Sequence, residues 1–277
     1  MRFIKIVLLA VMCFLMISNS VAVEQQNKAA YKFGVFPYLS AVRLDNIYAP
    51  VSDELSQVIA HKVKFRTSST FKKFLKKLKS GYYDFALIQP FWYPVAVDEV
   101  GYIPLLKMEE PFVSLIMVLD DSPIKKLSDL KGEVIATPPA FVPVVHMARR
   151  ALIEKGMQPG IDVEFKAYKT VDSCFQQLLI GNASACVAPP FAPVVFEEAM
   201  NVKFRVLLKS KAIPNLALVI HSRLNSSDRM KIRNTIMSWS DTSKGKKLLS
   251  DMQTERFLPI DDKDYDVVRK FLKEIEK

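Results

Sequence analysis

Histidines and cysteines are the side chains of this sequence that most often take part in catalysis, and their spacing argues against it. His61, His146 and His221 are far apart along the chain. No glycine-rich phosphate loop, nucleophile elbow or regular spacing of metal ligands accompanies them. A thiol dyad between His146 and a cysteine has no support from the spacing. The sequence therefore predicts no enzyme, no metal site and no cofactor.

Two cysteines lie close together in the second half of the chain. Cys174 falls in an expected helix, and Cys186 falls in the strand that follows it. An even pair of cysteines in an exported protein favours a disulfide, and a neighbouring helix and strand can bring the two within reach. Two free buried thiols are the alternative. We predict the disulfide.

A different chemistry comes from residues 137–143, which read Thr-Pro-Pro-Ala-Phe-Val-Pro. This segment follows a short apolar run and precedes an amphipathic stretch, the position at which open α/β proteins bind ligands. A helix start there normally offers backbone N–H groups to an anion, but the three prolines have none. The position predicts a binding loop, and its residues predict apolar chemistry.

Residues 36–40, 89–93 and 189–193 are loops of the same aromatic and proline-rich character. If the four loops converge, they form an apolar pocket with a few polar groups, chiefly Gln89, Tyr38 and Tyr93. The alternative is that these aromatic residues belong to the core. Loops normally lie at the surface, so four apolar loops favour the pocket. The predicted ligand-binding residues are Phe36, Tyr38, Gln89, Phe91, Trp92, Tyr93, Thr137, Ala140, Phe141, Pro190 and Phe191.

The N-terminus has the pattern of a secretory signal peptide. Arg2 and Lys5 precede an unbroken apolar run over residues 6–17, and small residues follow it up to Ala22. The run is too short to span a bilayer, so we predict residues 1–22 to be a signal peptide cleaved near Ala22. A retained membrane anchor is the alternative. Export then places the mature chain in the periplasm.

The composition is that of a packed globular protein with a basic surface. Half of the residues are apolar, 8 are glycine, and the net charge is +10. The basic residues interleave with an apolar stripe, as in Lys72, Lys73, Lys76 and Lys77 around Phe74. This pattern is typical of a solvated helix face. Together with export, it argues against nucleic acid as a partner.

Strand-like and helix-like segments alternate along the mature chain, which predicts an α/β architecture. The alternation occurs twice, so we expect two similar lobes. Residues 30–116 with 217–277 would form the first lobe, and 117–216 the second. Extended segments at 112–119 and 216–221 would cross between them. Two lobes joined by two such crossings form a cleft that closes by a hinge.

Several motifs make the chain similar to periplasmic solute-binding proteins of the phosphate, phosphite and phosphonate ABC-transporter type. They are Tyr-Asp-Phe-Ala-Leu-Ile-Gln-Pro-Phe-Trp-Tyr at 83–93, Leu-Ser-Asp-Leu-Lys-Gly at 127–132, the segment 172–185, and Asp-Asp-Lys-Asp-Tyr at 261–265. Their order covers nearly the whole mature chain. The resemblance implies the type II periplasmic binding fold, and delivery of a small-molecule ligand to an inner-membrane ABC permease or other membrane partner. We expect a monomer.

The chain departs from this family where phosphonate binders hold their ligand. Those proteins have a Ser-Thr-Ser cluster where this sequence has residues 140–142, Ala-Phe-Val, and a His where it has Val171. Residues 188–191, Ala-Pro-Pro-Phe, replace an acidic or polar side chain. Of the family's contacts, Tyr93 alone resembles a retained one. A buried dianion needs several charge-assisted donors, and few occupy these positions.

The sequence thus predicts a solute-binding protein whose ligand has a large apolar part, such as an aromatic compound or a lipid, for example a sterol-like one. Two alternatives remain open. One is a phosphonate- or phosphate-like oxyanion held by backbone N–H groups and unassigned basic residues. The other is a periplasmic sensor or interaction protein that signals to a membrane partner.

Overall fold

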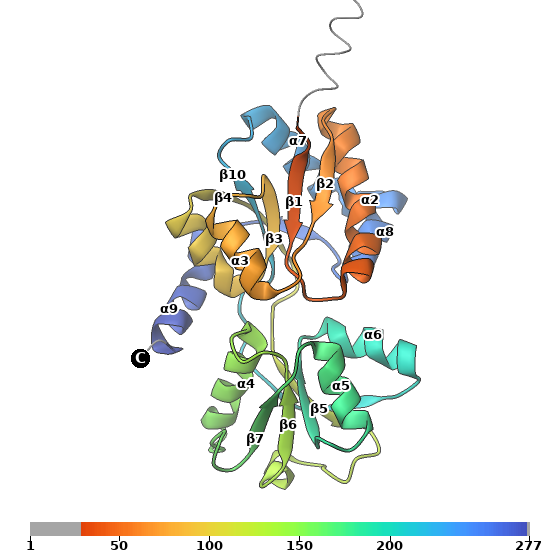
Figure 1. Ribbon diagram of the computed structural model, residues 1–277, viewed down its shortest axis with the longest axis vertical. Helices are drawn as coiled ribbons and strands as arrows, with labels where there is room; N and C mark the ends of the chain where they lie inside the picture. Colours follow the sequence, from red (N-terminus) through yellow and green to blue (C-terminus); the bar gives the residue numbers. More distant parts are fainter. Residues whose placement is uncertain (1–28, 276–277) are drawn as a thin grey trace, which may run out of the picture.

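The protein is described by a computed structural model that covers residues 29–275, without the side chains of residues 195, 198 and 199 (Figure 1). Two separate β-sheets, each flanked by helices, make up the molecule. This is the mixed α/β architecture that the alternating segments predict. The predicted signal peptide, residues 1–22, lies outside the described residues.

The first sheet has six strands in the order β11-β4-β10-β3-β1-β2. β1 pairs parallel with β2 and β3, whereas β10 pairs antiparallel with β3 and β4. The carboxyl ends of β1, β2 and β3 therefore lie at one edge of the sheet. The strands are β1 Tyr31–Val35, β2 Val63–Arg66, β3 Phe85–Ile88, β4 Tyr102–Met108, β10 Ala217–His221 and β11 Phe257–Pro259.

The second sheet has five strands in the order β7-β6-β8-β5-β9. β6 pairs parallel with β7 and β8, and β5 pairs antiparallel with β8 and β9. Its strands are β5 Leu115–Leu119, β6 Val134–Thr137, β7 Glu164–Ala167, β8 Ala185–Ala188 and β9 Phe204–Lys209. β5 thus belongs to the second sheet, two residues earlier than the predicted boundary at 116/117. The lobe boundaries as a whole stay a prediction.

The chain passes between the two sheets twice, from β4 to β5 and from β9 to β10. These crossings pair with each other. Phe112 and Ile213 exchange both backbone hydrogen bonds at 2.9 Å. The backbone N–H of Ser114 donates to Oγ of Ser210, also at 2.9 Å. The two crossings therefore form one hydrogen-bonded link rather than two independent threads.

Side-chain caps explain where several helices begin. Hydroxyl oxygens of Ser40, Thr70 and Thr170 accept hydrogen bonds from backbone N–H groups three residues later and start α2, α3 and α5. α7 and α8 pack on α2, while α4 and α5 cover opposite faces of the second sheet (Figure 1). The helices are α2 Ala41–Ile59, α3 Phe71–Lys79, α4 Pro143–Glu154, α5 Val171–Leu179, α6 Phe191–Met200, α7 Ser226–Met237, α8 Ser243–Asp251 and α9 Asp266–Ile275.

Short helical turns fill several connections. They are η1 Pro90–Trp92, η2 Val95–Glu99, η3 Leu127–Leu130, η4 Ser238–Asp241 and η5 Asp262–Tyr265. η1 follows β3 directly, so it begins at the carboxyl edge of the first sheet. Within residues 29–275, no helix has the length and apolar character needed to span a bilayer.

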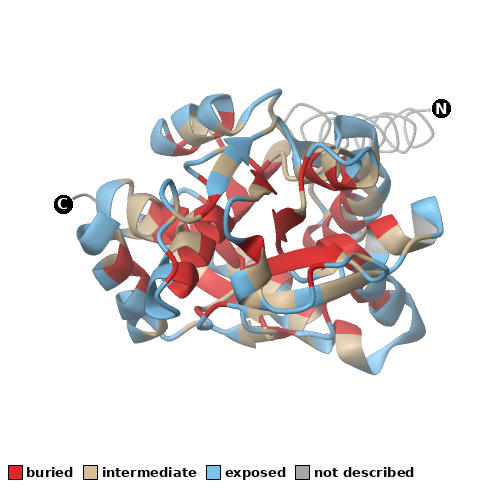
Figure 2. Cartoon of the chain, turned by 90° about the horizontal axis from the view of Figure 1, so that it is seen from below, coloured by how far each residue is buried: buried red, intermediate tan, exposed pale blue. Residues whose placement is uncertain are grey.

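Buried residues occupy the strands and the inner helix faces, and the outer helix faces are exposed (Figure 2). One contact shows how closely the first sheet is packed. A Cβ on Gly34 of β1 would lie 2.6 Å from ring atoms of Tyr83. Only glycine therefore lets this aromatic ring lie flat on the strand.

Two strands, β4 and β11, have no counterpart in the segments expected from the sequence. Pro104 interrupts β4, and proline inside a run argues against a strand because it lacks an N–H donor. The structure accommodates it at a register shift between Leu218 and Val219 of β10. There Leu105 is the extra residue, so the ladder continues on both sides.

Candidate ligand-binding site

A pocket lies between the two sheets, where loops from both meet. Phe36 and Tyr38 follow β1, Gln89 follows β3, Pro138 and Pro139 follow β6, and Pro189 and Phe191 follow β8. Each of the four apolar loops thus contributes to one lining. The free volume inside is about 60 Å³. The neighbouring crossings add Phe112 and Leu216.

Aromatic rings meet across the pocket from opposite sides. Tyr38 contacts Phe191 edge-on, with ring centroids 5.4 Å apart. Phe71, the first residue of α3, contacts Phe141 in the same manner at 5.8 Å. Edge-to-face pairs at this spacing contribute about 0.5–1.5 kcal/mol beyond the area they bury. In this conformation the two sides are therefore held together over the pocket.

Tyr38 is the one ionisable residue in the lining among residues 29–275. Its hydroxyl shares a hydrogen bond of 2.9 Å with the hydroxyl of Tyr48. Burial raises the pKa of Tyr38 to about 12, so the phenol is neutral at physiological pH. The lining carries no formal charge in the described part of the chain.

Gln89 is the polar residue of the lining whose hydrogen bonding is incomplete. Its side chain is 3% exposed, and Nε2 is buried with no hydrogen-bond partner among the described residues. Its backbone carbonyl accepts from the N–H of Trp92 and begins η1, which fixes the residue at the end of β3. A buried donor left unpaired costs about 1–3 kcal/mol. An acceptor on a ligand would remove that cost.

Thr170 adds a hydroxyl at the start of α5. That oxygen accepts from the N–H of Ser173 at 3.1 Å and contacts the Ser173 hydroxyl at 2.9 Å. Val171, the first residue of α5, also lines the pocket. The Thr170 oxygen already accepts as a cap, whereas Nε2 of Gln89 has no partner among the described residues, so Gln89 is the donor of the lining that is left unpaired.

Several predicted ligand-binding residues lie outside the lining. Phe91 packs on Phe271 and His146, with centroids 5.4 and 6.0 Å apart. Trp92 stacks on Phe74 at 5.7 Å and lies behind Phe36. These two rings support the pocket wall from the core. Any contact of theirs with a ligand stays a prediction.

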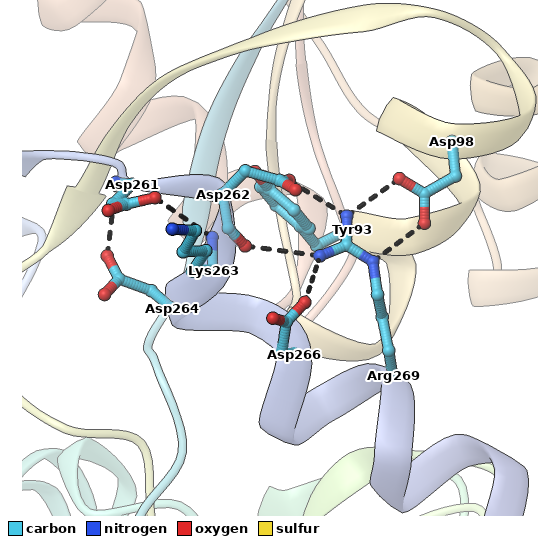
Figure 3. A network of polar contacts seen from close by, with 8 residues as sticks. All are labelled: Tyr93, Asp98, Asp261, Asp262, Lys263, Asp264, Asp266 and Arg269. Atoms are coloured by element: carbon cyan, nitrogen blue, oxygen red, sulfur yellow. Dashed lines mark hydrogen bonds and ion pairs between the residues drawn. The ribbon is translucent and has the colours of Figure 1, made fainter.

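Tyr93 does not line the pocket and is fully buried in a polar network around Arg269 (Figure 3). Its ring stacks on Tyr265 with centroids 3.7 Å apart, and its hydroxyl donates to Asp262 at 2.8 Å. Arg269 of α9 binds Asp98, Asp262 and Asp266 in the same network. Burial, followed by the bond to Asp262, raises the pKa of Tyr93. The network anchors α9 to the segment after β3.

The remaining predicted residues differ in exposure. Thr137 is buried at the end of β6, and its carbonyl accepts from the N–H of Tyr168. Ala140 and Pro190 are exposed, and Phe141 is 54% exposed beside Phe71. The structure therefore brings Phe36, Tyr38, Gln89 and Phe191 together and leaves the other predicted residues around them.

Phe71, Phe112, Thr170 and Leu216 line the pocket without having been predicted. Phe71 and Thr170 could have been found, because each lies where a strand gives way to a helix, as the four apolar loops do. Phe71 begins a lysine-rich helix, so its neighbours in the sequence indicate a solvated helix face rather than a pocket wall. Phe112 and Leu216 lie on the crossings, and no local pattern distinguishes them.

The predicted disulfide is not formed in the structure, where Cys174 and Cys186 are free and buried. Each thiol is oriented toward a backbone carbonyl: Cys174 donates to Thr170 at 3.3 Å and Cys186 to Val187 at 3.6 Å. Burial raises the pKa of the Cys186 thiol. Their proximity between α5 and β8 was anticipated, but the pair packs as two small apolar side chains.

The comparisons with known proteins agree with this fold. Residues 33–265 match the family of ABC transporter, phosphonate, periplasmic substrate-binding proteins, and the chain belongs to that family. Its members are periplasmic proteins that bind small ligands and work with ABC-transporter permeases. The protein is therefore a periplasmic solute-binding protein of the phosphonate-binding family. The members of this family are substrate-binding transport proteins and not enzymes.

Three solved structures illustrate the likeness. A binding-protein component of an ABC phosphonate transporter from Pseudomonas aeruginosa is 16% identical, with a TM-score of 0.78, over 90% of this chain and 87% of that one. PhnD1 from Prochlorococcus marinus, in complex with methylphosphonate, is 15% identical, with a TM-score of 0.75, over 90% and 98%. The periplasmic aliphatic sulphonate binding protein SsuA from Escherichia coli is 15% identical, with a TM-score of 0.64, over 90% and 87%. These likenesses establish the type II periplasmic binding fold.

Proposed function

We propose that the protein captures a small solute in the pocket between its two sheets and presents it to the permease of an ABC importer. The observation that carries this proposal is the unpartnered Nε2 of Gln89 in a pocket to which both lobes contribute. A ligand that offers an acceptor to this buried amide would gain a hydrogen bond that the protein leaves unmade, which supports the pocket as a site for a polar solute.

The family comparison favours a phosphonate or a related oxyanion-bearing solute over the lipid or sterol-like ligand expected from the apolar loops. Both the family model and the methylphosphonate-bound relative support this choice. The free volume of about 60 Å³ also argues against a sterol-sized ligand in this conformation. We therefore take a small organic oxyanion as the first candidate.

A predominantly apolar ligand remains the second candidate, because none of residues 29–275 brings a formal charge to the lining. Each apolar carbon buried by such a ligand contributes about 0.8 kcal/mol. An aromatic compound of modest size would satisfy the rings of Phe36, Tyr38 and Phe191 without an ion pair.

The paired crossings support closure by a hinge. Phe112 and Ile213 tie the two connections together, so rotation of one lobe against the other would bend both at the same place. We infer in addition that residues 1–22 are removed on export and that the mature protein acts as a monomer in the periplasm. The sequence of the N-terminus supports export.

A ligand screen on the mature protein tests the proposal. Thermal-shift measurements followed by calorimetry would compare phosphate, methylphosphonate, alkylsulphonates, aromatic acids and lipids. We expect an organic oxyanion to stabilise the protein and to bind in a 1:1 complex. Tight binding of a lipid with no response to any oxyanion would instead favour the apolar candidate. No response to any of these classes would contradict the solute-capture role.

A further inference from the structure

A second, larger cavity adjoins the pocket. It has a volume of about 500 Å³ and lies between α2, α8 and the second crossing. Three residues, Tyr38, Phe191 and Leu216, line both cavities. The Tyr38–Phe191 pair therefore separates an inner pocket from this outer chamber, and a ligand that occupies both has to move the two contacting rings apart.

The outer chamber has the polar chemistry that the inner pocket lacks. Its polar lining comprises Arg43, Asn46, Asn215, Lys247, Ser250 and Gln253. Lys247 is paired with Asp251, also in the lining, at 3.0 Å, so these two charges offset each other. Arg43 supplies the remaining positive charge.

Arg43 is incompletely paired. The carboxylate of Asp172 on α5 lies 4.0 Å away across the cleft, and both side chains are 42% exposed. Among the side chains that the structure describes, which do not include those of residues 195, 198 and 199, none forms a hydrogen bond with this guanidinium. A guanidinium can present two parallel donors to a carboxylate, phosphate or phosphonate, so Arg43 is available to an anionic group in the chamber.

We propose that the ligand is amphiphilic and occupies both cavities. A small apolar group with one acceptor atom fills the inner pocket and accepts from Gln89, and an oxyanion head group lies in the outer chamber against Arg43. This inference rests on the proposed solute-capture function and specifies its ligand class. It reconciles an oxyanion ligand with an uncharged inner pocket. A dianion in that pocket would lose its hydration shell and gain only one hydrogen bond, from the Gln89 amide. In the chamber the anion keeps water and gains a cation.

Calorimetry with methylphosphonate and butylphosphonate tests the two-cavity site on the mature protein. Three additional methylenes at about 0.8 kcal/mol each correspond to a gain in affinity of roughly fiftyfold if they enter the inner pocket. We expect butylphosphonate to bind tighter by that factor. Equal or weaker binding of butylphosphonate would overturn the inner apolar compartment, and failure of both phosphonates to bind would overturn the whole inference.

Arg43→Gln tests the head-group position, with Arg66→Gln as a control that removes the same charge from an exposed position on β2. We expect Arg43→Gln to weaken butylphosphonate about tenfold and Arg66→Gln to leave it unchanged. Equal affinities of the two variants would overturn the outer site.

Asp172→Asn separates this role from lobe closure, because it breaks the contact across the cleft and keeps Arg43. We expect its affinity for butylphosphonate to be unchanged or higher. A loss equal to that of Arg43→Gln would show that the pair acts in closure and would overturn the head-group assignment. Neither result for Asp172→Asn affects the solute-capture proposal, because that proposal is tested by the wider ligand screen.

Discussion

The ring of Tyr38 meets the ring of Phe191 edge-on at 5.4 Å, although the two residues belong to loops of different sheets. Tyr38 follows β1 of the first sheet, and Phe191 follows β8 of the second. The pair therefore links the lobes directly over the pocket. Opening the cleft for a ligand has to separate these rings, and closure around a ligand has to place them against it.

Replacing Phe191 by alanine removes this interlobe contact. We expect the closed form to lose about 0.5–1.5 kcal/mol, the value of an aromatic pair, together with the apolar contact that the ring offers a ligand. Ligand affinity in calorimetry should fall by tenfold or more. Phe141→Ala, which removes the other interlobe aromatic pair but no residue of the lining, is the comparison and should have a smaller effect. Equal losses in the two variants would contradict the role given to Phe191.

Gln89→Leu should separate ligand binding from stability. The substitution removes a buried donor with no partner, whose burial costs about 1–3 kcal/mol. We expect the ligand-free variant to be as stable as the original protein or more so, with a midpoint of thermal unfolding raised by about 2–4 °C per kcal/mol. Ligand affinity should fall. Calorimetry and thermal melts of the same preparation measure both effects.

The exposed residue Gln57 provides the control for that experiment. Gln57→Leu makes the same chemical change on the outer face of α2 and should alter neither affinity nor stability appreciably. If Gln89→Leu were destabilised while binding ligand normally, Gln89 would be a structural residue and the site assignment would be wrong.

Acid should weaken the network around Arg269. The hydrogen bond from Arg269 lowers the pKa of Asp262 below its usual value of 3.8. A carboxylate with a depressed pKa in the folded state stabilises the protein at neutral pH and loses that contribution as the pH falls below about 4. Asp262→Asn should therefore be less stable than the original protein at pH 7. Urea unfolding should show this gap narrowing as the pH approaches 3.

Asp53→Asn is the control for the acid experiment, because Asp53 is exposed on α2. Its stability should follow that of the original protein at both pH values. A gap between Asp262→Asn and the original protein that stayed constant from pH 7 to pH 3 would contradict an ionic role for Asp262.

An ion pair joins α4 to the C-terminal helix. Arg150 of α4 contacts Glu274 of α9 at 2.5 Å and lies over the ring of Phe271. Both charged side chains are partly exposed, so the pair is worth about 0.2–1 kcal/mol. Glu274→Gln should lower the ratio of closed to open molecules by up to about fivefold and raise the mean radius of gyration in X-ray scattering. Glu255→Gln, at an exposed position, should leave it unchanged.

Two thiols should be detected in the mature protein. Cys174 and Cys186 are free and buried, and burial raises the pKa of the Cys186 thiol, so neither should react quickly with a thiol reagent in the folded state. Denaturation without reductant should release two reactive thiols per chain. If the denatured protein had no reactive thiol, the two cysteines would be joined by the disulfide expected from the sequence, and the prediction of free thiols would be wrong.

The alternation of strands and helices could be predicted because it depends on local patterns. Caps such as Thr70 and Thr170 and the apolar strands are visible in short windows of sequence. β4 was not predicted, and Pro104 inside it argues against a strand. Only the pairing with β10 shows that a bulge next to Pro104 lets the strand continue.

The direction of each aromatic ring was less accessible. Loops after β1, β3, β6 and β8 were expected to converge, and each contributes to the lining. Which rings face the pocket depends on partners elsewhere in the chain. Trp92 stacks on Phe74, and the hydroxyl of Tyr93 donates to Asp262, which lies 169 residues further along the chain. A local pattern contains no information about such contacts.

A crystal structure of the mature protein with the strongest binder from the ligand screen tests the central claim most directly. We predict ligand density in the pocket between the sheets, with an acceptor atom within hydrogen-bond distance of Nε2 of Gln89 and an apolar group against Phe191. Ligand density at a site that Phe36, Tyr38, Gln89 and Phe191 do not line would contradict it.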